Sequence, residues 1–287
     1  MQRLQIRADE AGARLDRILC DRLTLSRSQA KRLFEGGVVR RNGRPADKGE
    51  LVVEGDTIEL AEVESSSEAW PDPEVEVRVR YEDEHLVWVD KAAGVPSHPL
   101  RPGELGCLAN GLLAKFPEMA QIGYDTRQPG LVNRLDNDTS GLILAARTQP
   151  AFAALRAMLE TGRIDKTYLA LTEKPLKPQR IELPLAPSPR HRARVEVSSL
   201  GRVALTEVTG CRPVGRYYLV EARAEKAYRH QVRVHLAAVG APIVGDALYG
   251  GAPEEHHYLH AYRARLTHPM HGTPMDVEAP LPASWPR

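Results

Sequence analysis

A change of composition near residue 61 divides the chain into two parts of unequal size. Residues 61–73, AEVESSSEAWPDP, are rich in Glu, Ser and Pro, a composition that favours a linker. We therefore expect a small unit at residues 1–62, an acidic linker at 63–75 and a large unit at 76–287. Apolar residues make up 42% of the 287, enough for a core of ordinary size.

The small unit has the pattern of two helices followed by short strands. Apolar side chains recur at helical spacing over residues 15–23, and Ser26 can cap a second helix that ends at Gly36 and Gly37. An Asn42-Gly43 turn then joins two short extended pieces. Residues 51–60, LVVEGDTIEL, predict a final strand.

Positive charge is concentrated in this small unit, although the net charge of the whole chain is only +1. Among residues 14–44, only Asp16, Asp21 and Glu35 oppose the cations. Such a face suits a phosphate backbone, but a solvated charged face explains it equally well. The candidate RNA-binding residues are Arg27, Lys31, Arg32, Arg40 and Arg41.

The large unit alternates strand-like and helix-like segments. Strand patterns include GLILAAR, TYLALTE and YYLVEARAE, and helix patterns include PAFAALRAMLETG and HQVRVHLAAVG. The stretch VEVRVRYEDEHLVWVDKAAG predicts two strands joined by a tight polar turn. The mixture predicts an α+β fold with a mostly antiparallel sheet.

Several classes of protein lack support in the sequence. The three cysteines lack metal-ligand spacing, and the sequence shows no signal-peptide pattern and no long apolar run. We therefore expect a cytoplasmic protein outside the membrane. Neither phosphate-loop nor dinucleotide-binding glycine pattern occurs. The histidines His256, His257 and His260 lack paired cysteines or acids at metal-ligand spacing, so we expect no metal.

The segment LVNRLDNDTSGLILAAR, residues 131–147, is the most informative for chemistry. An extended piece reaches Asp136, a polar turn follows, and an apolar strand begins at Leu142. Gly141 would allow a close backbone approach there. Asp136 could face a cleft as a reactive carboxylate, or it could simply satisfy backbone N–H groups of a hairpin turn together with Asp138.

The string RLDNDTSGLIL resembles the signature R-L-D-x-x-T-S-G of the RluA-type pseudouridine synthases. Ordered resemblances continue in VDKAAGVPSHP, RIDKTYLAL, RVALTEV, HQVRVHLAAVGAPIVGDALYGG and LHAYRARLTHP. The small unit resembles the RNA-binding module first named for the ribosomal protein S-four. The resemblance implies a mixed, mostly antiparallel catalytic domain with a central cleft and a small N-terminal α/β RNA-binding module. It also implies a cofactor-free, monomeric isomerase of uridines in structured RNA, with ribosomal favoured over transfer RNA.

The resemblance also assigns roles to residues. It implies that Asp136 is the catalytic carboxylate, which attacks the ribose or removes a ribose proton, and that Arg233 is its guanidinium partner. Tyr168 would stack on the uracil and assist proton removal. Surface placement of Arg233 and core packing of Tyr168 remain open from the pattern alone. The candidate substrate-binding residues are Arg134, Asn133, Thr139 and Leu236.

Three positions depart from the family pattern. Asn133 stands where the family usually has His, and residues 227–229, Ala-Tyr-Arg, replace Gly-Arg-Thr. Residues 91–94, Lys-Ala-Ala-Gly, lack the family's proline. These departures keep open a catalytically inactive RNA-binding assembly factor. A carboxylate glycosidase would need a second partnered acid, which the sequence does not offer.

Overall fold

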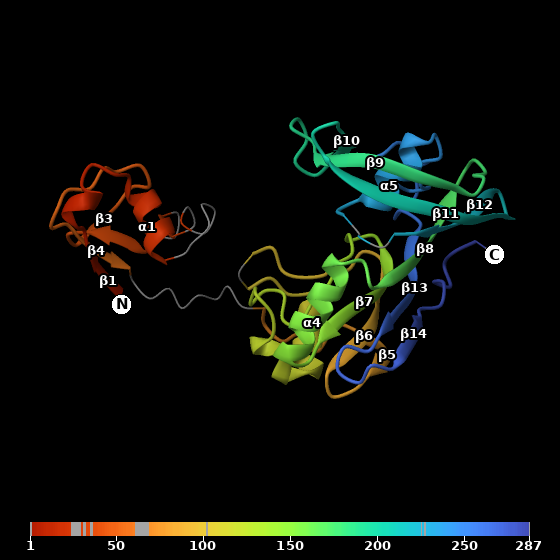
Figure 1. Ribbon diagram of the computed structural model, residues 1–287, viewed down its shortest axis with the longest axis horizontal. Coiled ribbons are helices and arrows are strands. Elements are labelled where there is room, and N and C mark those ends of the chain that lie inside the picture. The colour runs from red at the N-terminus through yellow and green to blue at the C-terminus, as the bar shows by residue number, and fades with distance from the viewer. Residues whose placement is uncertain are drawn as a thin grey trace. The chain divides into compact units, whose positions relative to one another are not determined.

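The computed structural model describes residues 2–23, 30, 33–34, 37–60, 69–101, 103–224, 226 and 228–286. The chain forms two compact units, residues 1–66 and residues 67–287, which Figure 1 shows as ribbons. Among the described residues, no helix is both long enough and apolar enough to cross a membrane.

The small unit packs one described helix on an antiparallel sheet. Its elements are β1 (Gln2–Gln5), η1 (Ala8–Glu10), α1 (Leu15–Leu23), β2 (Val39–Arg41), β3 (Arg44–Pro45) and β4 (Thr57–Leu60). The strand order is β1-β4-β2-β3. Helix α1 buries Leu15, Ile18 and Leu19 in a core shared with Val39 and Ile58, as the helical spacing predicted.

The expected Asn42-Gly43 turn joins β2 to β3. Both residues have positive φ angles, 50° and 78°, which is the backbone of a tight hairpin turn. The Asn42 side chain fastens this turn, because its Oδ1 accepts the backbone N–H of Thr57 at 2.8 Å. Most of the expected second helix lies outside the described residues, but Leu33 and Phe34 are helical and pack on the core.

The large unit is built on one ten-stranded sheet. Its elements are β5 (Arg78–Glu82), β6 (Leu86–Lys91), α3 (Leu108–Lys115), η2 (Pro117–Gln121), β7 (Ser140–Ala146), α4 (Gln149–Glu160), β8 (Asp165–Thr172), β9 (Gln179–Pro187), β10 (Val195–Val197), β11 (Arg202–Val214), β12 (Tyr217–Arg223), α5 (Gln231–Ala238), β13 (Leu259–Thr267) and β14 (Pro274–Glu278). The order is β10-β9-β11-β12-β8-β13-β7-β6-β5, with β14 paired to β13. Among the described strands, β7 and β13 are the only parallel pair, which confirms the predicted, mostly antiparallel α+β fold.

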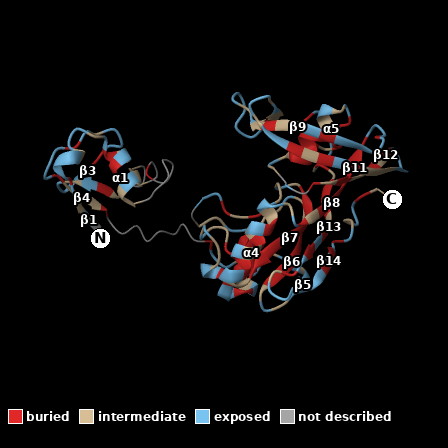
Figure 2. Cartoon of the chain, in the orientation of Figure 1, coloured by how far each residue is buried: buried red, intermediate tan, exposed pale blue. Residues whose placement is uncertain are grey.

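Strands β6 and β7 are buried along their whole length, as Figure 2 shows in red. Alternate side chains point to opposite faces, and each face meets its own helix. Leu142 and Leu144 join Phe152 and Leu155 of α4, whereas Ile143 joins the cluster formed by α3. A sheet covered on both faces explains why both strands read as nearly continuous apolar runs.

The expected linker, residues 63–75, is described only from residue 69 onward, and this part packs on the large unit. The backbone N–H of Ala69 donates to the carbonyl of Thr126 at 3.0 Å. The side chain of Asn110 donates to the carbonyl of Trp70 at 2.7 Å. The acidic composition alone gave no sign of these contacts.

Gly141 allows the parallel contact between β7 and β13. Its φ is +106°, and a Cβ atom at this position would lie 2.3 Å from the carbonyl oxygen of Ala261. Ala261 is its partner in the parallel register. The close backbone approach expected at Gly141 is therefore present, and only glycine allows it.

We expect Gly141→Ala to lower the free energy of unfolding by about 3 kcal/mol, because overpacking adds to backbone strain. Gly272→Ala is the matched control, since Gly272 also has a positive φ, +71°, but has open space around its Cβ position. It should cost about 1 kcal/mol, from strain alone. Urea denaturation measures the free energy of unfolding of both variants. Equal losses would contradict the argument that a Cβ at residue 141 clashes with the backbone of Ala261.

Candidate active site

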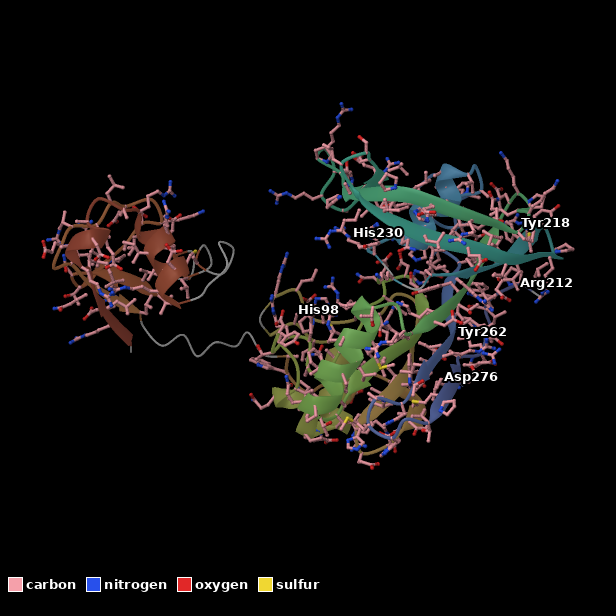
Figure 3. The ribbon with its side chains drawn as sticks, viewed as in Figure 1. His98, Arg212, Tyr218, His230, Tyr262 and Asp276 are labelled. Carbon is pink, nitrogen blue, oxygen red and sulfur yellow. The ribbon has the colours of Figure 1, made fainter. Side chains whose placement is uncertain are left out.

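A cavity of about 760 Å³ opens in the large unit. Its walls come from residues 96–98, 131–139 and 228–233, together with side chains of α4 and β8. Figure 3 shows His98 and His230 on opposite sides of the opening between the two halves of this unit. A concave site of this size is the usual form of a substrate pocket, and many polar and charged side chains line this one.

Asp136 and Arg233, which lie 97 positions apart in the sequence, meet in this cavity. Arg233 Nη1 donates to Asp136 Oδ2 at 2.6 Å. The other edge of the guanidinium binds Asp246 in a bidentate pair, with Nε–Oδ2 at 2.7 Å and Nη2–Oδ1 at 2.8 Å. Arg233 is a buried residue of helix α5, so its alternative placement as a surface arginine is wrong.

Charge explains why this buried guanidinium stays protonated. Burial lowers the pKa of Arg233, but the hydrogen bonds and charge of Asp246, with those of Asp136, outweigh it and raise the pKa. The Asp246 side chain is 1% exposed, whereas that of Asp136 is 26% exposed. Arg233 therefore has one carboxylate as a buried anchor and presents the other to the cavity.

The backbone around Asp136 is held from the side of residues 91–97. Lys91 Nζ donates to the carbonyls of Ala92, Val95 and Asn137, all within 2.8 Å. Three acceptors match the three donors of an ammonium group, although burial lowers the pKa of Lys91 to about 7. Lys91 therefore ties the turn after Asp136 to the end of β6 despite the missing family proline.

Three histidines also hold this turn, each binding one of three consecutive residues. His256 pairs with Asp138 at 3.2 Å, His257 bonds Thr139 at 2.7 Å, and His260 bonds Ser140 at 2.8 Å. Residues 133–136 are not a strand as expected, because their segment pairs only through a bridge at residue 131. These side-chain contacts, rather than a strand pair, position the loop.

Tyr168 and His230 complete the surroundings of Asp136. Burial, and then the charge of Asp136, raise the pKa of Tyr168, so its hydroxyl keeps its proton. His230 Nε2 lies 3.7 Å from Asp136 Oδ2, and its Nδ1 contacts the hydroxyl of Tyr249 at 2.8 Å. Burial lowers the pKa of His230 to about 4, so the imidazole is neutral near pH 7.

Of the four expected substrate-binding residues, Arg134, Asn133 and Thr139 line the cavity and Leu236 does not. Arg134 is exposed and donates to His98 Nε2 at 3.3 Å. Asn133 Oδ1 accepts the backbone N–H of Leu144 at 2.9 Å, so this oxygen supports β7. Leu236 is fully buried in the core, which corrects its expected contact with substrate.

Of the altered positions, Tyr228 and Arg229 line the cavity, and residue 227 lies outside the described residues. Arg229 donates to the carbonyls of Arg192 and Ala193 at 3.3 and 2.7 Å. Tyr228 donates its backbone N–H to the side chain of Gln231 at 3.0 Å. This segment therefore connects the start of α5 to the loop between β9 and β10.

The expected RNA-binding residues of the small unit fall into three groups. Arg27, Lys31 and Arg32 lie outside the described residues. Arg40 is exposed. Arg41 is occupied within the unit, because it pairs with the buried Asp56 at 2.6 Å and with Glu50 at 3.4 Å. The expected role of Arg40 and Arg41 in RNA binding stays a prediction.

Among the described residues, two groups of side chains have donor atoms close enough to hold a metal ion, and neither group lines the cavity. They are Asp83, His268 and His271, and Glu84, His85 and His271. The loops between β5 and β6 and between β13 and β14 carry them.

Sequence reasoning missed Asp246, which fixes Arg233, and His257, which binds the turn after Asp136. Asp246 lies in the family-like run HQVRVHLAAVGAPIVGDALYGG, but the resemblance gave it no role, and it follows a glycine there. Such a pattern reads as an ordinary turn.

Comparisons with known proteins agree with this geometry. A family model described as RNA pseudouridylate synthase matches residues 85–238, and one described as S4 domain matches residues 13–58. An uncharacterized RNA pseudouridine synthase of Chloroflexus aurantiacus is 38% identical over 96% of this chain and 88% of its own. The ribosomal large subunit pseudouridine synthase D of Xanthomonas campestris pv. campestris is 32% identical, with the same coverage.

A solved structure shares the fold. The human RNA pseudouridylate synthase domain containing 1 superposes with a TM-score of 0.58, at 22% identity. The match covers 79% of this chain and 91% of the human chain.

We expect Asp246→Ala to lower the free energy of unfolding by about 3 kcal/mol, because it removes the buried anchor of a buried cation. Asp276→Ala is the matched control. Asp276 makes a similar two-pronged contact with Arg263, but both side chains are partly exposed. That change should cost less than about 1 kcal/mol. Thermal denaturation of both variants gives their free energies of unfolding. A loss for Asp246→Ala as small as that for Asp276→Ala would contradict the anchoring role.

Proposed function

Because this chain belongs to the RNA pseudouridylate synthase family, whose members are isomerases, we propose that it converts specific uridines of large-subunit ribosomal RNA to pseudouridine through Asp136. The contact of Asp136 with the buried Arg233 in the cavity carries this proposal. The relative named as a ribosomal large subunit enzyme supports the choice of RNA. A cytoplasmic location and a monomeric state stay predictions.

The reaction is an isomerisation, so uridine and pseudouridine contain the same atoms. The bond from ribose C1′ to uracil N1 breaks, a bond from C1′ to C5 forms, the C5 proton is lost and N1 gains a proton. A carboxylate can attack C1′, holding the sugar while the base turns, or remove a ribose proton to release the base. Both routes need the carboxylate of Asp136 beside the ribose, and Arg233 Nη1 holds one of its oxygens at 2.6 Å.

Tyr168 is the residue suited to the base itself. Its ring lines the cavity and can stack on a pyrimidine, and its hydroxyl remains protonated beside Asp136. A protonated hydroxyl can transfer a proton while the bond from ribose C1′ moves from N1 to C5 of the base. We propose that the ring holds the detached uracil while the hydroxyl serves the proton transfer.

A uridine must leave its helix to reach this site. Extrusion costs a few kcal/mol, which contacts in the pocket must offset. The cavity of about 760 Å³ is large enough for a nucleotide, and the exposed Arg134 stands at its wall beside Asp136. We propose that Arg134 contacts the RNA around the extruded nucleotide, and that the small unit binds a neighbouring region.

Asp136→Asn should reduce the single-turnover rate of pseudouridine formation at least about a thousandfold, because the amide is not a nucleophile. RNA affinity should persist. Sequencing-based mapping of pseudouridine in total RNA, with and without the gene, supplies the target uridine. Asp276→Asn, at an exposed position of strand β14, should keep full activity. An active Asp136→Asn protein would refute the role of the carboxylate.

Tyr168→Phe separates the ring from the hydroxyl. We expect kcat to fall about a hundredfold because proton transfer is lost, while KM stays nearly constant because the stacking ring remains. Tyr168→Leu should raise KM as well. An unchanged kcat for Tyr168→Phe would show that the hydroxyl takes no part in the rate-limiting step.

A further inference from the structure

Lys166 is a buried cation with no partner in the described part of the chain. The residue is 7% exposed and lines the cavity from strand β8. No hydrogen bond and no ion pair links its ammonium group to any described residue, whereas Lys91, which is 1% exposed, binds three carbonyls. The fold therefore leaves a charge at the cavity wall that it does not satisfy.

Burial of the Lys166 ammonium costs folding free energy, and no contact with a described residue offsets this cost. A buried charge without a partner destabilises the folded state, and proteins normally pair or neutralise it. Burial alone lowers the pKa of Lys166 to about 8, and no charged group of the chain offsets it. Because that value is above neutral pH, most of the ammonium remains charged near pH 7.

The place of Lys166 relative to the reaction is set by the strand. Lys166 and Tyr168 are two residues apart on β8, so both point to the same face and both line the cavity. Lys166 also lines a small recess with Val132 and Leu159. Arg156, one turn before Leu159 on α4, donates to the carbonyl of Val132 at 3.1 Å, which brings a second cation to this wall.

We propose that Lys166 binds a backbone phosphate next to the extruded uridine, an inference that rests on the proposed function. An extruded nucleotide whose base stacks on Tyr168 carries a phosphate on either side of its ribose. An anion forms a stronger hydrogen bond with an ammonium than a neutral uracil carbonyl does. The missing partner of Lys166 is therefore supplied by the substrate, and stability is given up for binding.

Stability without RNA gives the first test. Lys166→Met keeps the length of the side chain and removes the charge, so the melting temperature should rise by a few degrees. Lys177→Met is the control, because Lys177 is exposed outside the cavity, and its melting temperature should not change. A lower melting temperature for Lys166→Met would show that Lys166 is a structural residue and would overturn the proposal.

The second test combines the Lys166→Met change with a change in the RNA and compares the resulting Kd values. The probe is a stem-loop of large-subunit ribosomal RNA with the mapped uridine, in which a neutral methylphosphonate replaces the phosphate on the 5′ or the 3′ side. On unmodified RNA, Lys166→Met should raise Kd about tenfold, as loss of one charged hydrogen bond predicts. On one of the two modified RNAs the same change should have no effect, because the contact is already lost.

These affinity measurements separate failure of the Lys166 phosphate contact from failure of the proposed function. If Lys166→Met raises Kd equally on all three RNAs, Lys166 contacts another group, such as the uracil, and the phosphate assignment is wrong. If the full chain binds the stem-loop without isomerising it, the proposed function fails, while the Kd cycle still decides the role of Lys166. Lys166→Arg, which keeps the charge, should recover most of the affinity and the sensitivity to the methylphosphonate.

Discussion

The active site depends on one guanidinium that lies between two carboxylates. Arg233 comes from helix α5, Asp136 from the loop before β7, and Asp246 from a turn after α5. A buried cation needs a counter-charge, and Asp246 supplies it where solvent does not reach. The Nη1 group of Arg233 then faces the cavity in a fixed direction. Asp136 is thereby positioned by a contact that a flexible lysine would not reproduce.

Much of the fold and the central residues could be predicted from the sequence, because apolar periodicity and a dense motif carry that information. The runs that form β6 and β7 predicted buried strands, and the motif around Asp136 predicted a meeting with Tyr168 and Arg233. The supporting residues could not be predicted in this way. Asp246 reads as a turn residue until the tertiary fold brings it within 2.8 Å of Arg233.

Errors in the expectations share one physical cause. Sequence reasoning sees a side chain but not its partners, so it gave no sign that Asp56 binds Arg41. Leu236 looked like a pocket residue because its neighbours in the motif are, yet the helix turns it into the core. Lys166 shows the opposite case, since only the absence of any partner in the described structure marks it as a residue that awaits its ligand.

The single-turnover rate of an Asp246→Asn protein tests the central claim most directly, because Asp246 reaches the substrate only through Arg233. The variant removes one charge and one acceptor but keeps the side-chain shape. If the guanidinium must be fixed to position Asp136, the rate of pseudouridine formation should fall about a hundredfold while RNA affinity is kept. A rate equal to that of the unchanged protein would contradict the account.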